Sequence, residues 1–197
     1  MKKTDELMEF TWLNIRNELI TQELLDDFKS GNSVFDEFLC SQALTWQDYS
    51  ESATYVFVTT ADLKENKIQR IYGYVSINAT GLMYTNSAGN RLYLPCAEIR
   101  MFAIHQSLRK HNNPTIKYSE ILFKLALQEL YCISTQIIGF RAIFLNANNE
   151  GYHLYKNCGF EEVKGYLSPE EEEKLDIEGT TPLILMINDN ITDVLFC

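Results

Sequence analysis

The spacing of apolar residues predicts helices in two parts of the chain. Between Thr21 and Ala43, apolar side chains recur at helical spacing in two amphipathic segments, separated at Ser30-Gly31-Asn32. From about Tyr118 to Thr135, a wide apolar stripe predicts one longer helix. The chain therefore opens with short helices and carries a long one in its second half.

Short runs rich in β-branched and aromatic residues predict strands between and after these helices. The predicted strands are residues 53–60, 71–77, 92–105, 140–145, 160–163 and 183–187. Residues 78–91, which are polar and contain two glycines, predict an exposed loop, and Pro95 is expected at the beginning of its strand. Strand, loop, helix and strand follow one another across residues 97–145, which predicts a right-handed βαβ unit. We expect one α/β domain over residues 1–197, with a mixed, mostly antiparallel sheet.

The stretch Leu145–Phe160 organises this prediction. Asn148 or Asn149 can accept hydrogen bonds from free N–H groups and so begin a short helix after a buried strand. Leu154 and Cys158 lie four residues apart on its apolar face, and Gly159 supplies the left-handed conformation that ends it. Tyr155 and His153 are the side chains of this helix that have useful chemistry.

Composition narrows the function classes. The net charge of −10 disfavours nucleic acid as a partner, although a local basic patch remains compatible with it. No apolar run reaches the roughly 18–20 residues that span a bilayer, and no signal peptide is recognisable. The five cysteines are odd in number and lack metal-binding spacing, which indicates reduced thiols and a cytoplasmic protein. No metal site is expected.

The later part of the stretch carries a resemblance to a known family. Asn148, followed by Leu154-Tyr155-Lys156-Asn157-Cys158-Gly159-Phe160, resembles the signature of the GNAT acyltransferase superfamily. The opening helices and the strands at 53–60 and 71–77 more loosely resemble its toxin-like subgroup. The resemblance implies a GNAT fold, acetyl-CoA as the acyl donor, contact of Asn148 with coenzyme A, and proton donation to the leaving thiolate by Tyr155.

The same resemblance implies a cofactor site at the βαβ unit. The backbone amides of Phe102, Ala103 and Ile104 are the expected donors to the thioester carbonyl. In the family, a glycine-rich loop before the long helix holds the pyrophosphate, whereas this chain places Thr115, Lys117 and Ser119 at the glycine positions. The hydroxyls of Thr115 and Ser119 and the positive charges of Lys117 and Arg109 can still pair with phosphate. The added Cβ atoms, however, keep the phosphates farther from the backbone than glycines would.

The sequence indicates the general base that deprotonates the acceptor amine less clearly than it indicates the proton donor. Glu98 lies on the strand expected to run beside the acyl group, where the family sometimes keeps a glutamate base; a solvent-facing glutamate is an equally good interpretation. His105 and His153 are alternatives. Cys158 is expected in the core rather than as a nucleophile.

We therefore predict an N-acetyltransferase that acts on a small-molecule or protein amine by direct attack and is a possible homodimer. Two alternatives remain open. A GNAT fold that has lost acyl-CoA binding would serve as a binding or regulatory module. A toxin-like enzyme acting on aminoacyl-tRNA would need its basic residues on one face: Arg91, Arg100, Arg109, Lys110 and Lys117.

Overall fold

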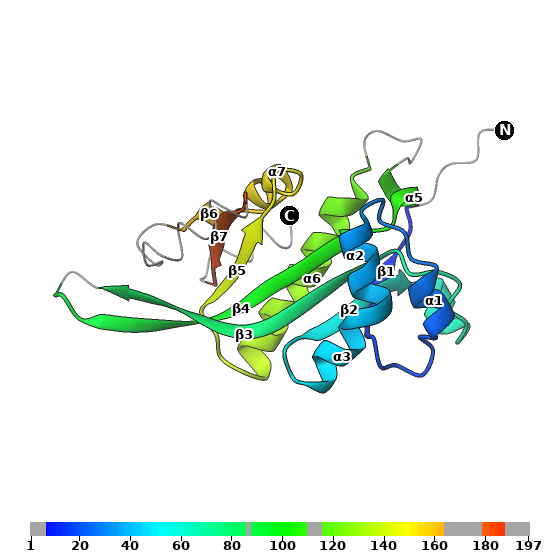
Figure 1. The fold of residues 1–197 in the computed structure, drawn as a ribbon, viewed down its shortest axis with the longest axis horizontal. Coiled ribbons are helices and arrows are strands. Elements are labelled where there is room, and N and C mark those ends of the chain that lie inside the picture. Colours follow the sequence, from blue (N-terminus) through cyan, green and yellow to red (C-terminus); the bar gives the residue numbers. More distant parts are fainter. Residues whose placement is uncertain (1–6, 86–87, 110–115, 164–178, 188–197) are drawn as a thin grey trace. The chain divides into compact units, whose positions relative to one another are not determined.

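A computed structural model describes residues 7–85, 88–109, 116–163 and 179–187. Its strands form one seven-stranded mixed sheet in the order β1-β2-β3-β4-β5-β7-β6 (Figure 1). The strands are β1 (Phe10–Asn14), β2 (Ala53–Thr59), β3 (Gly73–Thr85), β4 (Arg91–Ile104), β5 (Ala142–Ala147), β6 (Glu161–Glu162) and β7 (Thr181–Met186). The predicted α/β class with a mixed sheet is confirmed.

Helices occur mainly before β2 and between β4 and β5. They are α1 (Gln22–Asp26), α2 (Ser33–Glu37), the π-helical turn η1 (Phe38–Gln42), α3 (Ala43–Asp48), α4 (Thr60–Lys64), α5 (Gln106–Arg109), α6 (Tyr118–Gln136) and α7 (Tyr152–Asn157). β4 and β5 pair in parallel, with Cys96 opposite Ala142 and Ile99 opposite Leu145. The predicted β–α–β unit is thus β4–α6–β5.

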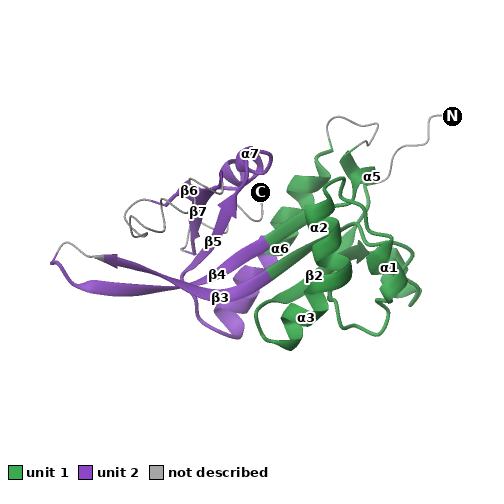
Figure 2. Cartoon of the chain, in the orientation of Figure 1, with its two compact units in different colours: residues 1–76, 101–126 green, residues 77–100, 127–197 purple. Residues whose placement is uncertain are grey.

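Contacts divide the chain into two compact units, which Figure 2 colours separately. Unit 1 comprises residues 1–76 and 101–126, and unit 2 comprises residues 77–100 and 127–197. In unit 1, the helices α1 to α3 contribute Leu25, Phe28 and Phe38 to a core that also contains Val56 and Tyr74. This aromatic-rich burial supplies most of the driving force for folding of the unit.

The prediction of an exposed loop over residues 78–91 is wrong, because β3 continues to Thr85 and β4 already begins at Arg91. Leu82 is buried with Leu94 in the core cluster of unit 2. The ring of Tyr93 lies directly over Gly81, whose missing side chain makes room for it. A strand with one exposed face contains few apolar residues, so the spacing of apolar residues alone did not predict this hairpin.

Three smaller expectations also need correction. Pro95 lies inside β4 rather than at its beginning, and its carbonyl accepts a hydrogen bond from the N–H of Arg141 at 2.9 Å. The charged connection after β2 contains the single-turn helix α4, which the Thr59 hydroxyl caps. The expected loop after β4 begins with the four-residue helix α5. Helices this short bury too few apolar residues for a helical spacing to be visible in the sequence.

The alternation of side chains along β4 shifts by one residue. On β3, even-numbered residues join both core clusters: Tyr74 in unit 1, and Leu82 and Tyr84 in unit 2. On β4, Leu94 and Cys96 join the cluster of unit 2, but the odd-numbered Met101 and Ala103 join that of unit 1. The residues that join a core cluster therefore have even numbers in the first part of β4 and odd numbers in its last part.

Candidate active site

The turn between β5 and α7 is built by Asn148. Its side-chain oxygen accepts a hydrogen bond from the N–H of Gly151 at 2.8 Å, and its backbone carbonyl accepts one from the N–H of Tyr152 at 3.0 Å. The helix itself begins at Tyr152 with Gly151 at its N-cap and no side-chain cap, so Asn148 shapes the turn before the helix and the expected asparagine cap is wrong. Since the side-chain oxygen serves the turn, the amide NH₂ is the part of Asn148 suited to contact a ligand.

Tyr155 lies one turn into α7, with its ring against the backbone of Gly151. A β-carbon at position 151 would lie 2.6 Å from Cε2 of Tyr155, so glycine is needed for this ring position. The ring of Phe160 lies 6.2 Å away, centroid to centroid. The Tyr155 ring is thus fixed by its neighbours, which is the condition for directing a hydroxyl at a reacting group.

The environment of Tyr155 keeps its hydroxyl protonated. Although part of the side chain remains accessible, burial of the hydroxyl raises the pKa of Tyr155 to about 12, with a further contribution from the nearby Cys158. Loss of the proton would leave a phenolate in a poorly solvated place. At neutral pH the residue is therefore a proton donor and not a base.

The other residues of α7 do not share this environment. The Tyr152 hydroxyl donates to Oε1 of Glu162 at 2.7 Å, and this hydrogen bond is the main reason that the pKa of Tyr152 is raised. His153 is exposed. Cys158 is fully buried, as expected for a core residue, and Gly159 ends the helix with φ of +87°. Tyr155 is the side chain of this helix best suited to acid catalysis.

Glu98 lies on β4, opposite Phe144 of β5, and is half-buried. Its neighbours two residues away along the strand are Cys96, which is 3% exposed, and Arg100, which is exposed. The carboxylate thus stands where a buried part of the strand meets solvent. That position suits a base that takes up a proton and passes it to water.

The side chains of Phe102, Ala103 and Ile104 are used for packing in unit 1. The ring of Phe102 contacts that of Phe123 on α6 at 5.0 Å, and Ala103 and Ile104 are buried. The carbonyl of Ala103 lies so near Gly73 that a β-carbon there would be 2.7 Å from it. What these three residues can offer a ligand is therefore their backbone.

Of the predicted phosphate-binding residues, Arg109, Lys117 and Ser119 are described, and all three belong to unit 1. Arg109 is exposed on α5, Lys117 is exposed directly before α6, and Ser119 is half-buried in its first turn. Thr115 and Lys110 lie outside the described residues. The 19-residue α6 presents the positive end of its dipole here. Glu120 in the same turn opposes an anion, although its carboxylate lies 3.8 Å from the ammonium of Lys124.

The described candidates are divided between the two compact units. Glu98, Asn148 and Tyr155 belong to unit 2, and the remaining described candidates belong to unit 1. Among the described residues, no group of three or more His, Cys, Asp and Glu side chains could hold a metal ion. Across the same residues, no helix is long and apolar enough to cross a membrane.

His105, considered above as an alternative base, lies elsewhere. It lines a pocket in unit 1 with Leu24, Asp27, Phe28 and Arg70 among others. Burial lowers the pKa of His105, and the charge of Arg70 lowers it further, while Asp36 acts in the opposite sense. Sequence reasoning missed this pocket because its lining comes from three distant segments, none of which forms a motif.

Comparison with solved structures shows the fold. The AtaT toxin, determined as a tyrosine-to-phenylalanine mutant, matches with a TM-score of 0.68 and 15% identity, over 96% of this chain and 94% of that one. A tyrosine-to-phenylalanine mutant of the toxin KacT matches with a TM-score of 0.63 and 14% identity, over 94% and 97%. AtaT complexed with acetyl-methionyl-tRNAfMet matches with a TM-score of 0.63 and 16% identity, over 96% and 100%. No protein-family model and no curated protein matches the chain. The chain has the fold of toxin-like GNAT proteins.

Proposed function

We propose that this chain is an N-acetyltransferase that transfers the acetyl group of acetyl-CoA to a primary amine by direct attack. The observation that carries the proposal is Tyr155, a half-buried tyrosine whose hydroxyl stays protonated and whose ring lies against Gly151 on the helix that follows β5. A fold shared with AtaT and KacT supports it, and both toxins were determined as tyrosine-to-phenylalanine mutants. A further AtaT structure contains bound acetyl-CoA.

Each residue has a role set by its chemistry. Acetyl-CoA, when bound, supplies an activated acetyl thioester. Glu98 accepts a proton from the acceptor's ammonium group, directly or through water, so that the neutral amine can attack. The amides of Phe102, Ala103 and Ile104 donate to the thioester oxygen, where negative charge develops as the C–N bond forms. Tyr155 donates its hydroxyl proton to the sulfur as the C–S bond breaks, so that a neutral thiol leaves.

Binding of coenzyme A is assigned to backbone and polar groups. The amide NH₂ of Asn148 donates to the pantetheine arm, and the N-terminus of α6 with Lys117, Ser119 and Arg109 faces the phosphates. Thr115 completes this set in the proposal. Side chains replace the family's glycines in this loop, so the backbone cannot approach the phosphates closely and positive charge must hold them instead. The affinity for acetyl-CoA should therefore depend strongly on salt concentration.

The acceptor is proposed to be a small-molecule or protein amine, because a net charge of −10 repels nucleic acid. A second candidate is aminoacyl-tRNA, favoured by the neighbour complexed with acetyl-methionyl-tRNAfMet. Arg91, Arg100, Arg109 and Lys117 are all exposed, as phosphate contacts would require.

An acetyl-transfer assay tests the proposal. Thiol release from acetyl-CoA is followed with three acceptors: a small primary amine, a lysine-containing peptide and methionyl-tRNA. Acetylation of any of them supports the enzyme, and the preferred acceptor decides between the two candidates. If acetyl-CoA binds but no acceptor accelerates thiol release, direct transfer to these amines is excluded. If acetyl-CoA does not bind, the non-catalytic alternative is favoured.

A further inference from the structure

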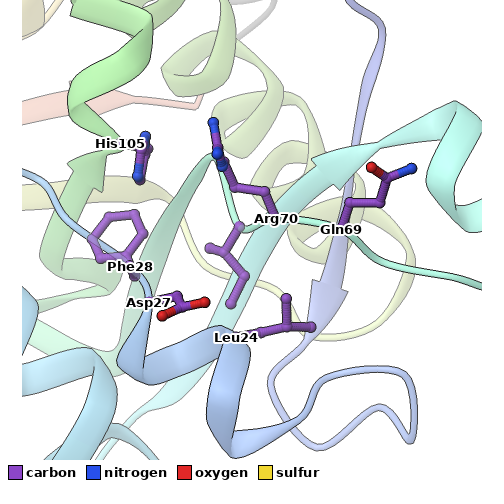
Figure 3. A pocket seen from close by; sticks show the side chains of 7 residues that line it. Leu24, Asp27, Phe28, Gln69, Arg70 and His105 are labelled. Atoms are coloured by element: carbon purple, nitrogen blue, oxygen red, sulfur yellow. The ribbon is translucent and has the colours of Figure 1, made fainter.

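Unit 1 contains a pocket of about 190 Å³ that the proposed acetyl transfer does not use (Figure 3). Asp27 and Phe28 bring the end of α1 to it, Arg70 belongs to the segment before β3, and His105 follows β4. Pockets that hold drug-sized ligands measure about 300–1,000 Å³, so this one suits a smaller molecule.

The lining of the pocket combines three apolar side chains with an uncharged donor. Leu24, Phe28 and Ile71 form the apolar part, and the ring of His105 lies edge-to-face on Phe28 with centroids 5.9 Å apart. Nδ1 of His105 accepts a hydrogen bond from the N–H of Ser107 at 3.2 Å. In the neutral imidazole the proton is therefore on Nε2, which is available as a donor. With only 9% of His105 exposed, this donor is held in a fixed place.

Two opposite charges complete the lining. In Figure 3 the guanidinium of Arg70 lies at the same end of the pocket as His105, and the carboxylate of Asp27 lies at the other end. Both side chains are exposed, and no ion pair among the described residues joins them to each other or to a third group. A pocket whose cation and anion stay apart is complementary to a ligand that carries both charges itself.

We propose that this pocket binds a free α-amino acid with a small apolar side chain. Arg70 and Nε2–H of His105 donate to its carboxylate, and Asp27 accepts from its ammonium group. The side chain lies on Leu24 and Ile71. An ammonium group paired with Asp27 keeps its proton and cannot attack a thioester, so the amino acid is a bound effector and not the acetyl acceptor. The inference does not depend on the proposed acetyl transfer.

Calorimetric titration of the full chain with three matched probes tests the proposal. L-valine carries both charges, isovalerate lacks the ammonium group, and isobutylamine lacks the carboxylate. We expect L-valine to bind, and each of the other two to bind at least tenfold more weakly, which corresponds to about 1.4 kcal/mol. Equal binding of L-valine and isovalerate would contradict recognition of both charges.

Variants assign the binding to this pocket. Arg70→Gln and Asp27→Asn should each weaken L-valine binding at least tenfold, whereas the neighbouring exposed Lys67→Gln and Asp26→Asn make the same charge changes outside the lining and should not. Unchanged L-valine binding in both pocket variants would overturn the assignment. So would the absence of L-valine binding to the wild type at roughly 10 mM, which is ten times a Kd of about 1 mM. Acetyl-CoA titrated into the same preparations reports on the proposed enzyme separately.

Discussion

Each of the two units buries a tyrosine, and the surroundings of the two rings differ. In unit 1, Tyr74 is fully buried, packs edge-to-face on Phe28 at 5.4 Å and donates its hydroxyl proton to the carbonyl of Phe35 at 2.9 Å. In unit 2, the Tyr155 ring rests on the backbone of Gly151 and remains partly accessible. Burial raises the pKa of both hydroxyls.

The difference separates a structural hydroxyl from a chemically useful one. The Tyr74 hydroxyl connects β3 to α2 and is enclosed by the core of unit 1, so no ligand can reach it. Tyr155 has the same preference for its proton but lies on a short helix near solvent. A raised pKa alone therefore does not indicate a functional tyrosine. A raised pKa together with a side chain that a ligand can reach does.

The largest expected effect comes from Tyr155→Phe. If Tyr155 protonates the leaving thiolate, the substitution should lower kcat about 10²–10⁴-fold, the usual range for loss of a general acid. The melting temperature should change little because the ring keeps its contact with Gly151. Steady-state thiol release and thermal unfolding measure the two quantities.

The matched control is Tyr152→Phe, which removes a hydroxyl from the same helix together with its hydrogen bond to Glu162. Its kcat should stay within a few-fold of the wild type. A comparable loss of kcat in both variants would mean that α7 tolerates no hydroxyl removal and that Tyr155 has no special role.

Next in size is Gly73→Ala in unit 1. The new β-carbon would lie 2.7 Å from the carbonyl oxygen of Ala103 and 3.3 Å from side-chain carbons of Leu122 and Phe57. Because a strand backbone cannot move away as a side-chain tip can, we expect a loss of about 1–3 kcal/mol in the free energy of unfolding. Urea denaturation measures it. Gly139→Ala, with no atom within 4 Å of its β-carbon, is the control and should be nearly neutral.

Tyr74→Phe should have a smaller effect. It removes the hydrogen bond to Phe35, but that carbonyl also accepts from the N–H of Phe38 and is not left without a partner. We expect a loss of about 1 kcal/mol in the free energy of unfolding. Acetyl-transfer activity should be retained under conditions where the variant is folded. A loss of activity with an unchanged denaturation curve would contradict the structural role.

The last prediction concerns alkaline pH and involves no substitution. Burial raises the pKa of Cys96 from 9.0 to about 11 and that of Tyr155 from 10.0 to about 12. The folded state then holds these protons more tightly than the unfolded chain, so the contribution of these two groups to stability is constant below about pH 9 and falls as pH rises above it. Thermal unfolding from pH 7 to 11 should show this decline. A melting temperature that rises across this range would contradict it.

Strong apolar patterns made much of the fold predictable. The strand at 53–60 and the helix from Tyr118 were recognisable because long apolar periods bury whole faces. The β3–β4 hairpin was missed over residues 78–85 because Asn78 and Thr80 interrupt the apolar run and Gly81 suggests a loop, although Tyr93 covers this glycine.

Some features of the candidate site were likewise predictable from the sequence, and others were not. Gly159 was predictable because the left-handed end of a helix favours glycine, whereas Asn148 serves the turn before the helix and not the cap expected of it. The shift of parity in β4 leaves no trace in residue type, since any residue except proline can offer an amide. The pocket around His105 joins three distant segments, so only the folded chain shows that Arg70 and Asp27 line it together.

Binding of acetyl-CoA to the wild type and to Tyr155→Phe tests the central claim most directly. If the site is catalytic as proposed, both proteins bind, because the hydroxyl acts only when the C–S bond breaks. Acetyl-CoA at 100 times its Kd should then stabilise each by about 2.7 kcal/mol. No stabilisation of either protein at millimolar acetyl-CoA would contradict the account and favour a fold that has lost its cofactor.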